Sequence, residues 1–204
     1  MLSDLPNVLT LSRIGAIPVL VVLAAIRDPA ADWAACLVFT IAAVTDWLDG
    51  HYARARNQQS DFGRMMDPIA DKLLVAATLM MLVGEHRLSH AGLFPALVIL
   101  LREILVSGLR EFLAGRRLSL PVSRLAKWKT GVQMGALGTL LVGDAGARAA
   151  GIGFLPVSAI GEAMLWVAAG LTLLTGWDYL TAGVRQATTT ETAGLHGTAR
   201  GADR

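Results

Sequence analysis

Residues 37–83 read LVFTIAAVTDWLDGHYARARNQQSDFGRMMDPIADKLLVAATLMMLV, an acidic segment between two apolar runs. Four carboxylates of the segment fall in two pairs, Asp46 with Asp49 and Asp67 with Asp71, and a fifth, Asp61, could cap the second helix. The first two are three residues apart and the last two are four apart, so on helices each pair shares one face. Two helices joined by a short turn would bring the pairs together. The stretch therefore predicts a helical hairpin that carries a cup of four carboxylates.

The chain as a whole is apolar enough for a membrane protein. Of its 204 residues, 54% are hydrophobic and 17% are charged, with a mean hydropathy of +0.53; soluble domains carry about 25% charged residues. A spanning helix needs roughly 20 mostly apolar residues. Six segments approach this length: about 7–26, 33–55, 61–84, 91–113, 124–143 and 154–182. We therefore predict an all-α integral membrane protein with six transmembrane helices in one domain, over residues 1–187.

The two ends of the chain fall outside these spans. Residues 2–5 predict a short amphipathic lead-in at the membrane surface. A secretory signal would carry basic residues before its apolar part, and the first span is preceded by none, so we predict a retained first helix. Residues 188–204, rich in Thr, Gly and Ala, predict a disordered cytoplasmic tail. The single Cys36 excludes an intrachain disulfide and is typical of a small buried hydrophobe.

Lysine and arginine are distributed unevenly between the two sides of the predicted bundle. One side holds the cations of residues 54–64, 110–129 and 185–204, whereas the opposite loops hold only Arg27, Arg87 and Arg148. The positive-inside rule then places both termini and the acidic hairpin on the cytoplasmic side of a cell inner membrane. A basic rim there favours anionic lipid headgroups and phosphorylated substrates. Nucleic acid is not expected as a partner, because no basic soluble module is present.

Residues with little side-chain bulk continue both acidic faces of the predicted hairpin. They lie one helical turn from an aspartate, at Gly50, Ala53 and Gly63. Such residues let a ligand approach the backbone closely, and the adjacent Arg54 can bind a phosphate. Ionisable groups at membrane depth are costly, and hard divalent cations are the natural partners of clustered carboxylates. Together these features predict a Mg²⁺–diphosphate site in which Asp71, the aspartate farthest from the turn, serves as general base.

Three other interpretations of the acidic hairpin stay open at this point. The aspartates could line a solvated loop, form a cation-transport site, or belong to a membrane prenyltransferase, which also binds Mg²⁺–diphosphate through aspartate pairs. A transporter would need no arginine beside its acids, and the Gly50, Ala53 and Arg54 pattern has no place in the prenyltransferase motif. His51 follows Asp49 by two residues and so lies off the helical face that Asp46 and Asp49 share. We therefore expect it to point away from the metal.

The full spacing resembles the signature of the CDP-alcohol phosphatidyltransferases. It reads Asp46-x2-Asp49-Gly50-x2-Ala53-Arg54-x8-Gly63-x3-Asp67-x3-Asp71, and all eight fixed positions match. Residues 5–13 look like the first helix of that family. Within the family, residues 102–111 and 127–133 are most similar to the bacterial phosphatidylglycerophosphate synthases. The resemblance covers residues from about 5 to 180.

The resemblance implies a six-helix fold, a homodimer and a cavity open to the cytoplasmic leaflet. It implies that Asp46, Asp49 and Asp67 hold two divalent cations, Mg²⁺ or Mn²⁺, with the first and last bridging them. Asp71 would bind the second cation and act as base. The expected CDP-binding residues combine the family's contacts with the small residues of the hairpin: Asn7, Thr10, Gly50, Ala53, Arg54, Ser60 and Gly63.

The reaction implied by the resemblance joins CDP-diacylglycerol to sn-glycerol 3-phosphate. The 1-hydroxyl would attack the lipid-linked phosphorus, CMP would leave, and phosphatidylglycerol phosphate would remain in the membrane. The predicted site for the acceptor phosphate consists of cations from the fourth and fifth spans: Arg102, Arg110, Lys127 and Lys129. A dianionic acceptor needs such a cluster, whereas serine or choline does not.

The choice of acceptor leaves alternatives. The same donor could serve a cardiolipin synthase, with phosphatidylglycerol as acceptor, or an enzyme that uses inositol phosphate. The cations could also merely follow the positive-inside rule, and Arg102 could pair with Glu103 or Glu111. Glu162 lies in the last span with no partner that the sequence indicates.

Overall fold

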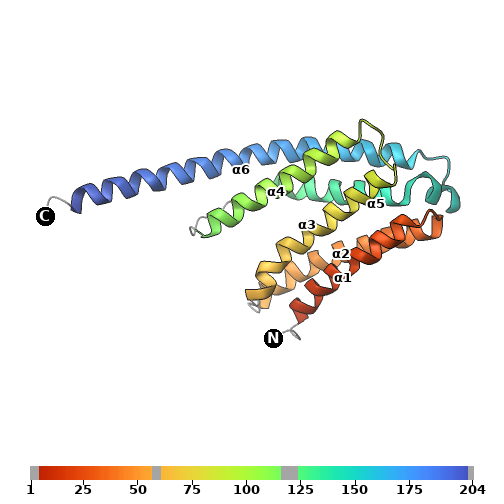
Figure 1. Ribbon diagram of the computed structural model, residues 1–204, viewed down its shortest axis with the longest axis horizontal. Coiled ribbons are helices and arrows are strands. Elements are labelled where there is room, and N and C mark those ends of the chain that lie inside the picture. Colours follow the sequence, from red (N-terminus) through yellow and green to blue (C-terminus); the bar gives the residue numbers. More distant parts are fainter. Residues whose placement is uncertain (1–4, 57–60, 116–123, 202–204) are drawn as a thin grey trace.

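The protein, described by a computed structural model over residues 5–56, 61–115 and 124–201, is all-helical in this part (Figure 1). Side chains are described at residues 10–45, 66, 69–115, 125–177 and 179–181. The helices are α1 Leu5–Ala25, α2 Pro29–Arg56, α3 Asp61–Gly84, α4 Leu93–Gly115, α5 Arg124–Ala149 and α6 Val157–Gly201. The predicted all-α fold with six helices is confirmed over these residues.

Successive helices alternate in direction. The beginning of α1, the end of α2 and the beginning of α3 therefore lie at the same end of the bundle (Figure 1). Helix α1 packs against both α2 and α3, α2 packs against α5, and α6 packs against both α4 and α5. Helices α3 and α4 contact each other much less. The two acidic helices thus share α1 as a neighbour, while α4, α5 and α6 form the other part of the bundle.

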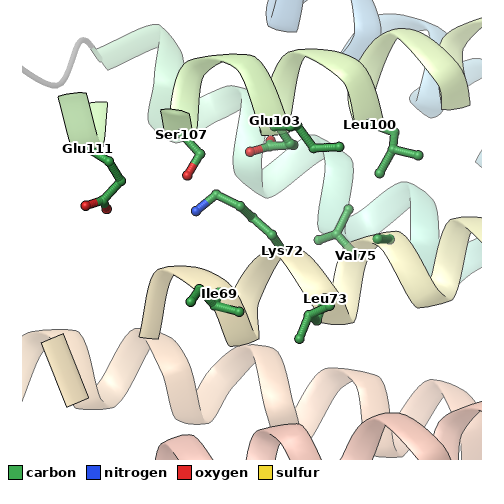
Figure 2. A pocket seen from close by; sticks show the side chains of 10 residues that line it. Ile69, Lys72, Leu73, Val75, Leu100, Glu103, Ser107 and Glu111 are labelled. Atoms are coloured by element: carbon green, nitrogen blue, oxygen red, sulfur yellow. The ribbon is translucent and has the colours of Figure 1, made fainter. Parts of the chain in front are cut away.

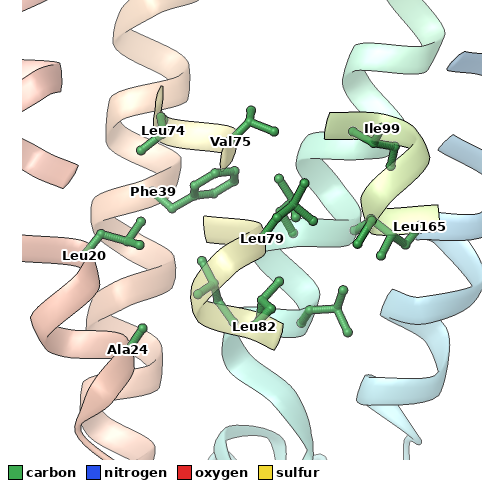
Figure 3. Close-up of a cluster of buried hydrophobic side chains, with 14 of the residues drawn as sticks. Leu20, Ala24, Phe39, Leu74, Val75, Leu79, Leu82, Ile99 and Leu165 are labelled. Carbon is green, nitrogen blue, oxygen red and sulfur yellow. The ribbon is translucent and has the colours of Figure 1, made fainter. Parts of the chain in front are cut away.

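A core of aliphatic and aromatic side chains joins all the helices (Figure 3). Each helix contributes at least one side chain that is 2% exposed or less: Leu20, Phe39, Leu74, Ile99, Leu140 and Leu165. Glycines allow the closest approaches. At Gly161 of α6 a Cβ atom would lie 2.8 Å from Cγ of Leu140, so only glycine fits against α5 there. Small residues at helix contacts are typical of packing within membranes.

Only part of the predicted membrane topology has direct support. Among the described residues, Val157–Thr181 of α6 is the one stretch long and apolar enough to cross a membrane. Thr10–Ala25 and Pro29–Thr45 are apolar but shorter. Charged residues in α3 and α4 and glycines in α5 lower the hydropathy of those helices. Six helices are therefore shown, and six membrane spans stay a prediction.

Two helices are longer than the apolar segments that predicted them. Helix α5 extends past Gly143, whose φ of 58° and ψ of −174° mark a kink between two merged helical pieces. Just beyond, the Asp144 carboxylate accepts a hydrogen bond from the Ser158 backbone N–H at 2.9 Å, and this bond holds the pKa of Asp144 below its ordinary value. Helix α6 reaches Gly201 and so includes most of the predicted tail, and no proline interrupts residues 157–201.

At the end of the bundle opposite the acidic hairpin, Arg87 joins three helices. Its guanidinium donates to the Leu141 carbonyl at 2.6 Å, to the Ala24 carbonyl at 3.3 Å and to the Asp32 carboxylate at 2.5 Å. The Arg87 and Asp32 side chains are only 17% and 6% exposed. This connection fixes the ends of α1 and α5 and the beginning of α2 relative to one another.

Replacing Arg87 with alanine is expected to lower the free energy of unfolding by about 3 kcal/mol, because the buried Asp32 carboxylate loses its charged partner. The free energy can be measured by SDS denaturation in mixed micelles. Arg27→Ala is the matched control, since Arg27 is 77% exposed in its ion pair with Glu85 and should cost no more than about 0.5 kcal/mol. Equal losses in the two variants would contradict a specific role for Arg87.

Candidate active site

The acidic residues lie at neighbouring ends of α2 and α3. Asp46 and Asp49 belong to the last three turns of α2, and Asp67 and Asp71 to the first three turns of α3. Both segments have helical backbone, so the predicted face-sharing within each pair holds. The side chains of Asp46, Asp49 and Asp67 lie outside the described ones, and that of Asp71 is half-buried.

The other predicted hairpin residues can be placed by their backbone alone. Gly50, Ala53 and Arg54 belong to α2 and Gly63 to α3, so all lie on the two acidic helices. Ser60 falls outside the described residues, as does the side chain of His51. On α1, the side chain of Asn7 is not among those described, whereas Thr10 is 1% exposed.

A divalent cation fits the chemistry of these residues. Carboxylate oxygens are the ligands that Mg²⁺ and Mn²⁺ prefer, and helical pairs three and four residues apart present them from one face. Among the described side chains no group of three metal-binding residues occurs, since three of the four aspartates lie outside that set. The predicted metal site therefore rests on the placement of the four residues on α2 and α3.

A second group of charges connects α4, α5 and α6. Lys129 of α5 is 4% exposed and pairs with Glu103 of α4. Arg102 donates through Nη2 to Thr175 Oγ1 at 2.9 Å, and Arg110 donates through Nη2 to the Tyr179 hydroxyl at 2.8 Å. Lys129 also interacts electrostatically with Arg102 and with Asp71 of the acidic hairpin.

Three of the four residues predicted to bind the acceptor phosphate therefore lie together. Arg102, Arg110 and Lys129 belong to the cationic group, whereas Lys127 is exposed and no described contact links it to the others. The alternative in which Arg102 pairs with Glu103 does not hold, because Glu103 pairs with Lys129.

Sequence reasoning missed the contribution of α6 to this group. In the sequence, Trp177 and Tyr179 at the end of the last apolar segment are typical of an aromatic belt at the membrane interface. In the structure Trp177 is 70% exposed, but Tyr179 is 4% exposed and faces α4. A spacing signal was present, since Thr172, Thr175 and Tyr179 share one face of α6.

A pocket of about 430 Å³ opens between α3 and α4 (Figure 2). Its apolar wall includes Leu73 and Leu100, and its polar end is formed by Lys72, Ser107 and Glu111, with Glu103 beside them. In helical register, Leu73 lies on the side of α3 away from Asp67 and Asp71. Val75, another lining residue, is four residues after Asp71 and shares its face, so the pocket borders the acidic face, and its polar end lies near the cationic group.

Comparison with known proteins shows which family the chain belongs to. The family model for CDP-alcohol phosphatidyltransferase matches residues 3–174. The chain belongs to this family. The match covers α1 to α5 and most of the apolar part of α6, so it includes both the acidic hairpin and the cationic group. The family predicted from the eight spaced residues is confirmed.

Several relatives of this CDP-alcohol phosphatidyltransferase carry the name CDP-diacylglycerol–glycerol-3-phosphate 3-phosphatidyltransferase. A protein of Rickettsia bellii is 46% identical, with 88% of this chain and 95% of the relative covered. One from Cereibacter sphaeroides is 40% identical, covering 86% and 93%. One from Shigella flexneri is 42% identical, covering 88% and 94%. The similarity thus runs over nearly the whole length of these relatives.

Proposed function

We propose that the chain transfers the phosphatidyl group of CDP-diacylglycerol to sn-glycerol 3-phosphate. The observation that carries this proposal is the 46% identity, over 88% of the chain, to a relative named for that reaction. The cationic group supports it independently, because Arg102, Arg110 and Lys129 together suit a dianionic acceptor. We do not propose the alternative functions of membrane prenyltransferase or cation transporter, since the chain belongs to a different family.

In the proposed reaction the 1-hydroxyl oxygen of glycerol 3-phosphate forms a bond to the lipid-linked phosphorus. The bond from that phosphorus to the bridging oxygen of the diphosphate breaks, and CMP leaves with the electron pair. Asp71 takes the hydroxyl proton. Its half-buried position on α3, within electrostatic reach of Lys129 of the cationic group, supports this role.

Asp46, Asp49, Asp67 and Asp71 would hold two divalent cations, Mg²⁺ or Mn²⁺, which supply positive charge to the diphosphate and to the departing CMP. The residues proposed to bind the CDP moiety come from α1, the acidic helices and the α2–α3 connection: Asn7, Thr10, Gly50, Ala53, Arg54, Ser60 and Gly63. Arg54 follows Ala53 directly, so its guanidinium can bind a phosphate oxygen beside the small residues.

The enzyme would act within the inner membrane as a six-span homodimer, with both termini and the active site on the cytoplasmic side. Exposed apolar side chains support a lipid environment. Every helix has a large apolar residue that is at least 60% exposed: Val22, Leu37, Met80, Ile104, Trp128 and Leu174. Soluble monomers rarely expose so much apolar surface. Lipid tails would cover it.

The proposed reaction can be tested with purified protein in detergent, CDP-diacylglycerol and Mg²⁺. We expect CMP release that depends on glycerol 3-phosphate. Release only with phosphatidylglycerol would reassign the chain to cardiolipin synthesis, and release only with inositol phosphate would reassign it to inositol lipids. Absence of release with every alcohol would contradict the enzymatic proposal.

Arg110→Ala is expected to raise the KM for glycerol 3-phosphate about 30-fold, because a charge-assisted contact to phosphate is lost. The KM for CDP-diacylglycerol should change less than about twofold. Lys127→Ala serves as the comparison: Lys127 was also predicted to bind the acceptor, but no described contact joins it to Arg102, Arg110 or Lys129, so a smaller effect is expected. An equal rise in both Michaelis constants of Arg110→Ala would instead indicate a structural role.

A further inference from the structure

Tyr179 contacts both arginines of the cationic group. Its hydroxyl accepts the hydrogen bond from Arg110, and its ring centroid lies 4.7 Å from Cζ of Arg110 and 5.6 Å from Cζ of Arg102. Both distances lie within the range of cation–π attraction. One buried side chain of α6 thus holds two guanidinium groups of α4 beside each other.

Neighbouring residues of α6 complete this arrangement. Thr175, one helical turn before Tyr179, accepts a hydrogen bond from Arg102, and its own hydroxyl donates to the Leu171 carbonyl. At Gly176 a Cβ atom would lie 3.2 Å from Cγ of Arg102, so the glycine leaves room for the arginine stem. A hydroxyl, a small residue and an aromatic ring therefore form one face of α6 that receives both arginines.

All of these partners are electrically neutral. Among the described residues, no hydrogen bond of Arg102 or Arg110 goes to a carboxylate, and one buried atom, Arg102 Nε, has no hydrogen-bond partner. Arg102 is half-buried and Arg110 is exposed, and an arginine withdrawn from water for a purely structural role is normally paired with an acid. Lys129 follows that rule, since Glu103 neutralises it. The arginines differ: their orientation is fixed while their positive charge stays available.

We propose that Tyr179 is a positioning residue that, with Thr175, fixes Arg102 and Arg110 as an uncompensated cation pair for the phosphate of the acceptor. This inference rests on the proposed function, because it assumes a phosphorylated acceptor at the cationic group. It adds that selectivity for the dianion comes from the two arginines on the neutral face of α6, rather than from Lys129, whose charge is already paired.

Two substitutions at Tyr179 separate its contacts. Tyr179→Phe keeps the ring and removes the hydroxyl bonded to Arg110, so the KM for glycerol 3-phosphate should rise about tenfold. Tyr179→Leu also removes the cation–π contacts and should raise it about 30-fold. In both variants the KM for CDP-diacylglycerol should stay within about twofold of the wild-type value. Trp177→Leu is the matched control, because Trp177 lies on the same helix but is 70% exposed.

Thr175→Asp tests the charge argument directly. The new carboxylate would replace a neutral partner of Arg102 with an anionic one, so it should preserve the melting temperature while raising the KM for glycerol 3-phosphate about tenfold. If the arginines only tie α4 to α6, this variant would bind glycerol 3-phosphate as well as the wild type does.

The outcomes separate this inference from the proposed function. If wild-type turnover depends on glycerol 3-phosphate but Tyr179→Phe and Tyr179→Leu leave its KM unchanged, or raise both Michaelis constants equally, the role of Tyr179 is overturned. If the wild type uses another phosphorylated acceptor, the proposed function fails, and the KM for that acceptor decides the role of Tyr179 by the same comparison. An acceptor without phosphate would overturn both.

Discussion

Asp71→Asn is expected to reduce turnover by at least about a thousandfold, while CDP-diacylglycerol still binds. Asparagine has nearly the same shape, but its amide cannot accept the proton of the attacking hydroxyl. The same change also removes one proposed cation ligand, and this adds to the loss. Turnover is measured as CMP released per enzyme, and donor binding as the rise in melting temperature on addition of CDP-diacylglycerol.

A second carboxylate provides the control for this substitution. Glu85 lies outside the proposed site, in an ion pair with the exposed Arg27, so Glu85→Gln should leave turnover within about twofold of the wild-type rate. Asp71→Asn should retain the wild-type melting temperature without substrate. Near-normal turnover in Asp71→Asn would remove the base from the proposed mechanism, and loss of donor binding would indicate that the residue acts mainly through the metal site.

Removing divalent cations is expected to lower the rate of CMP release by several orders of magnitude. Without cations, the four clustered aspartates of the acidic hairpin would repel one another and the substrate diphosphate, and bound cations would reverse that sign of charge. The protein should be stripped with EDTA, dialysed and assayed. Either Mg²⁺ or Mn²⁺ should restore activity, because both prefer oxygen ligands.

Asp67→Ala distinguishes loss of the metal from damage by the chelator. The variant should stay inactive at any Mg²⁺ concentration, and added Mn²⁺ should no longer raise its melting temperature as it raises that of the wild type. Asp144→Asn is a suitable control, since Asp144 lies beyond the kink of α5, away from the acidic hairpin. Full activity of the stripped wild-type protein would contradict the proposed metal site.

The sequence predicted most of the helical architecture, because apolar length and helical spacing are local properties. The expected segment 61–84 coincides with α3, and 33–55 nearly coincides with α2. Apolarity ends before the helix does in α5 and α6, since helical backbone needs only hydrogen bonds and the absence of proline. The two helices thus continue beyond residues 143 and 182, where the predicted apolar segments end.

In the candidate site, too, only the relations between residues of one helix could be predicted from the sequence. Asp46, Asp49, Asp67 and Asp71 could be paired from spacing because each pair belongs to one helix. The partners of Arg102 and Arg110 could not, because they lie 73 and 69 residues away on α6, and spacing does not indicate which helices are neighbours. Tyr179 is consequently absent from the predicted site residues, although its face of α6 contacts α4.

The central claim, transfer of a phosphatidyl group to glycerol 3-phosphate, is tested most directly by following the acceptor. Purified enzyme would be incubated with CDP-diacylglycerol, Mg²⁺ and radiolabelled glycerol 3-phosphate, and the lipid phase would be extracted. We expect label in phosphatidylglycerol phosphate, formed in equal amount to the released CMP and absent with Asp71→Asn. CMP release with no label in the lipid phase would contradict the account.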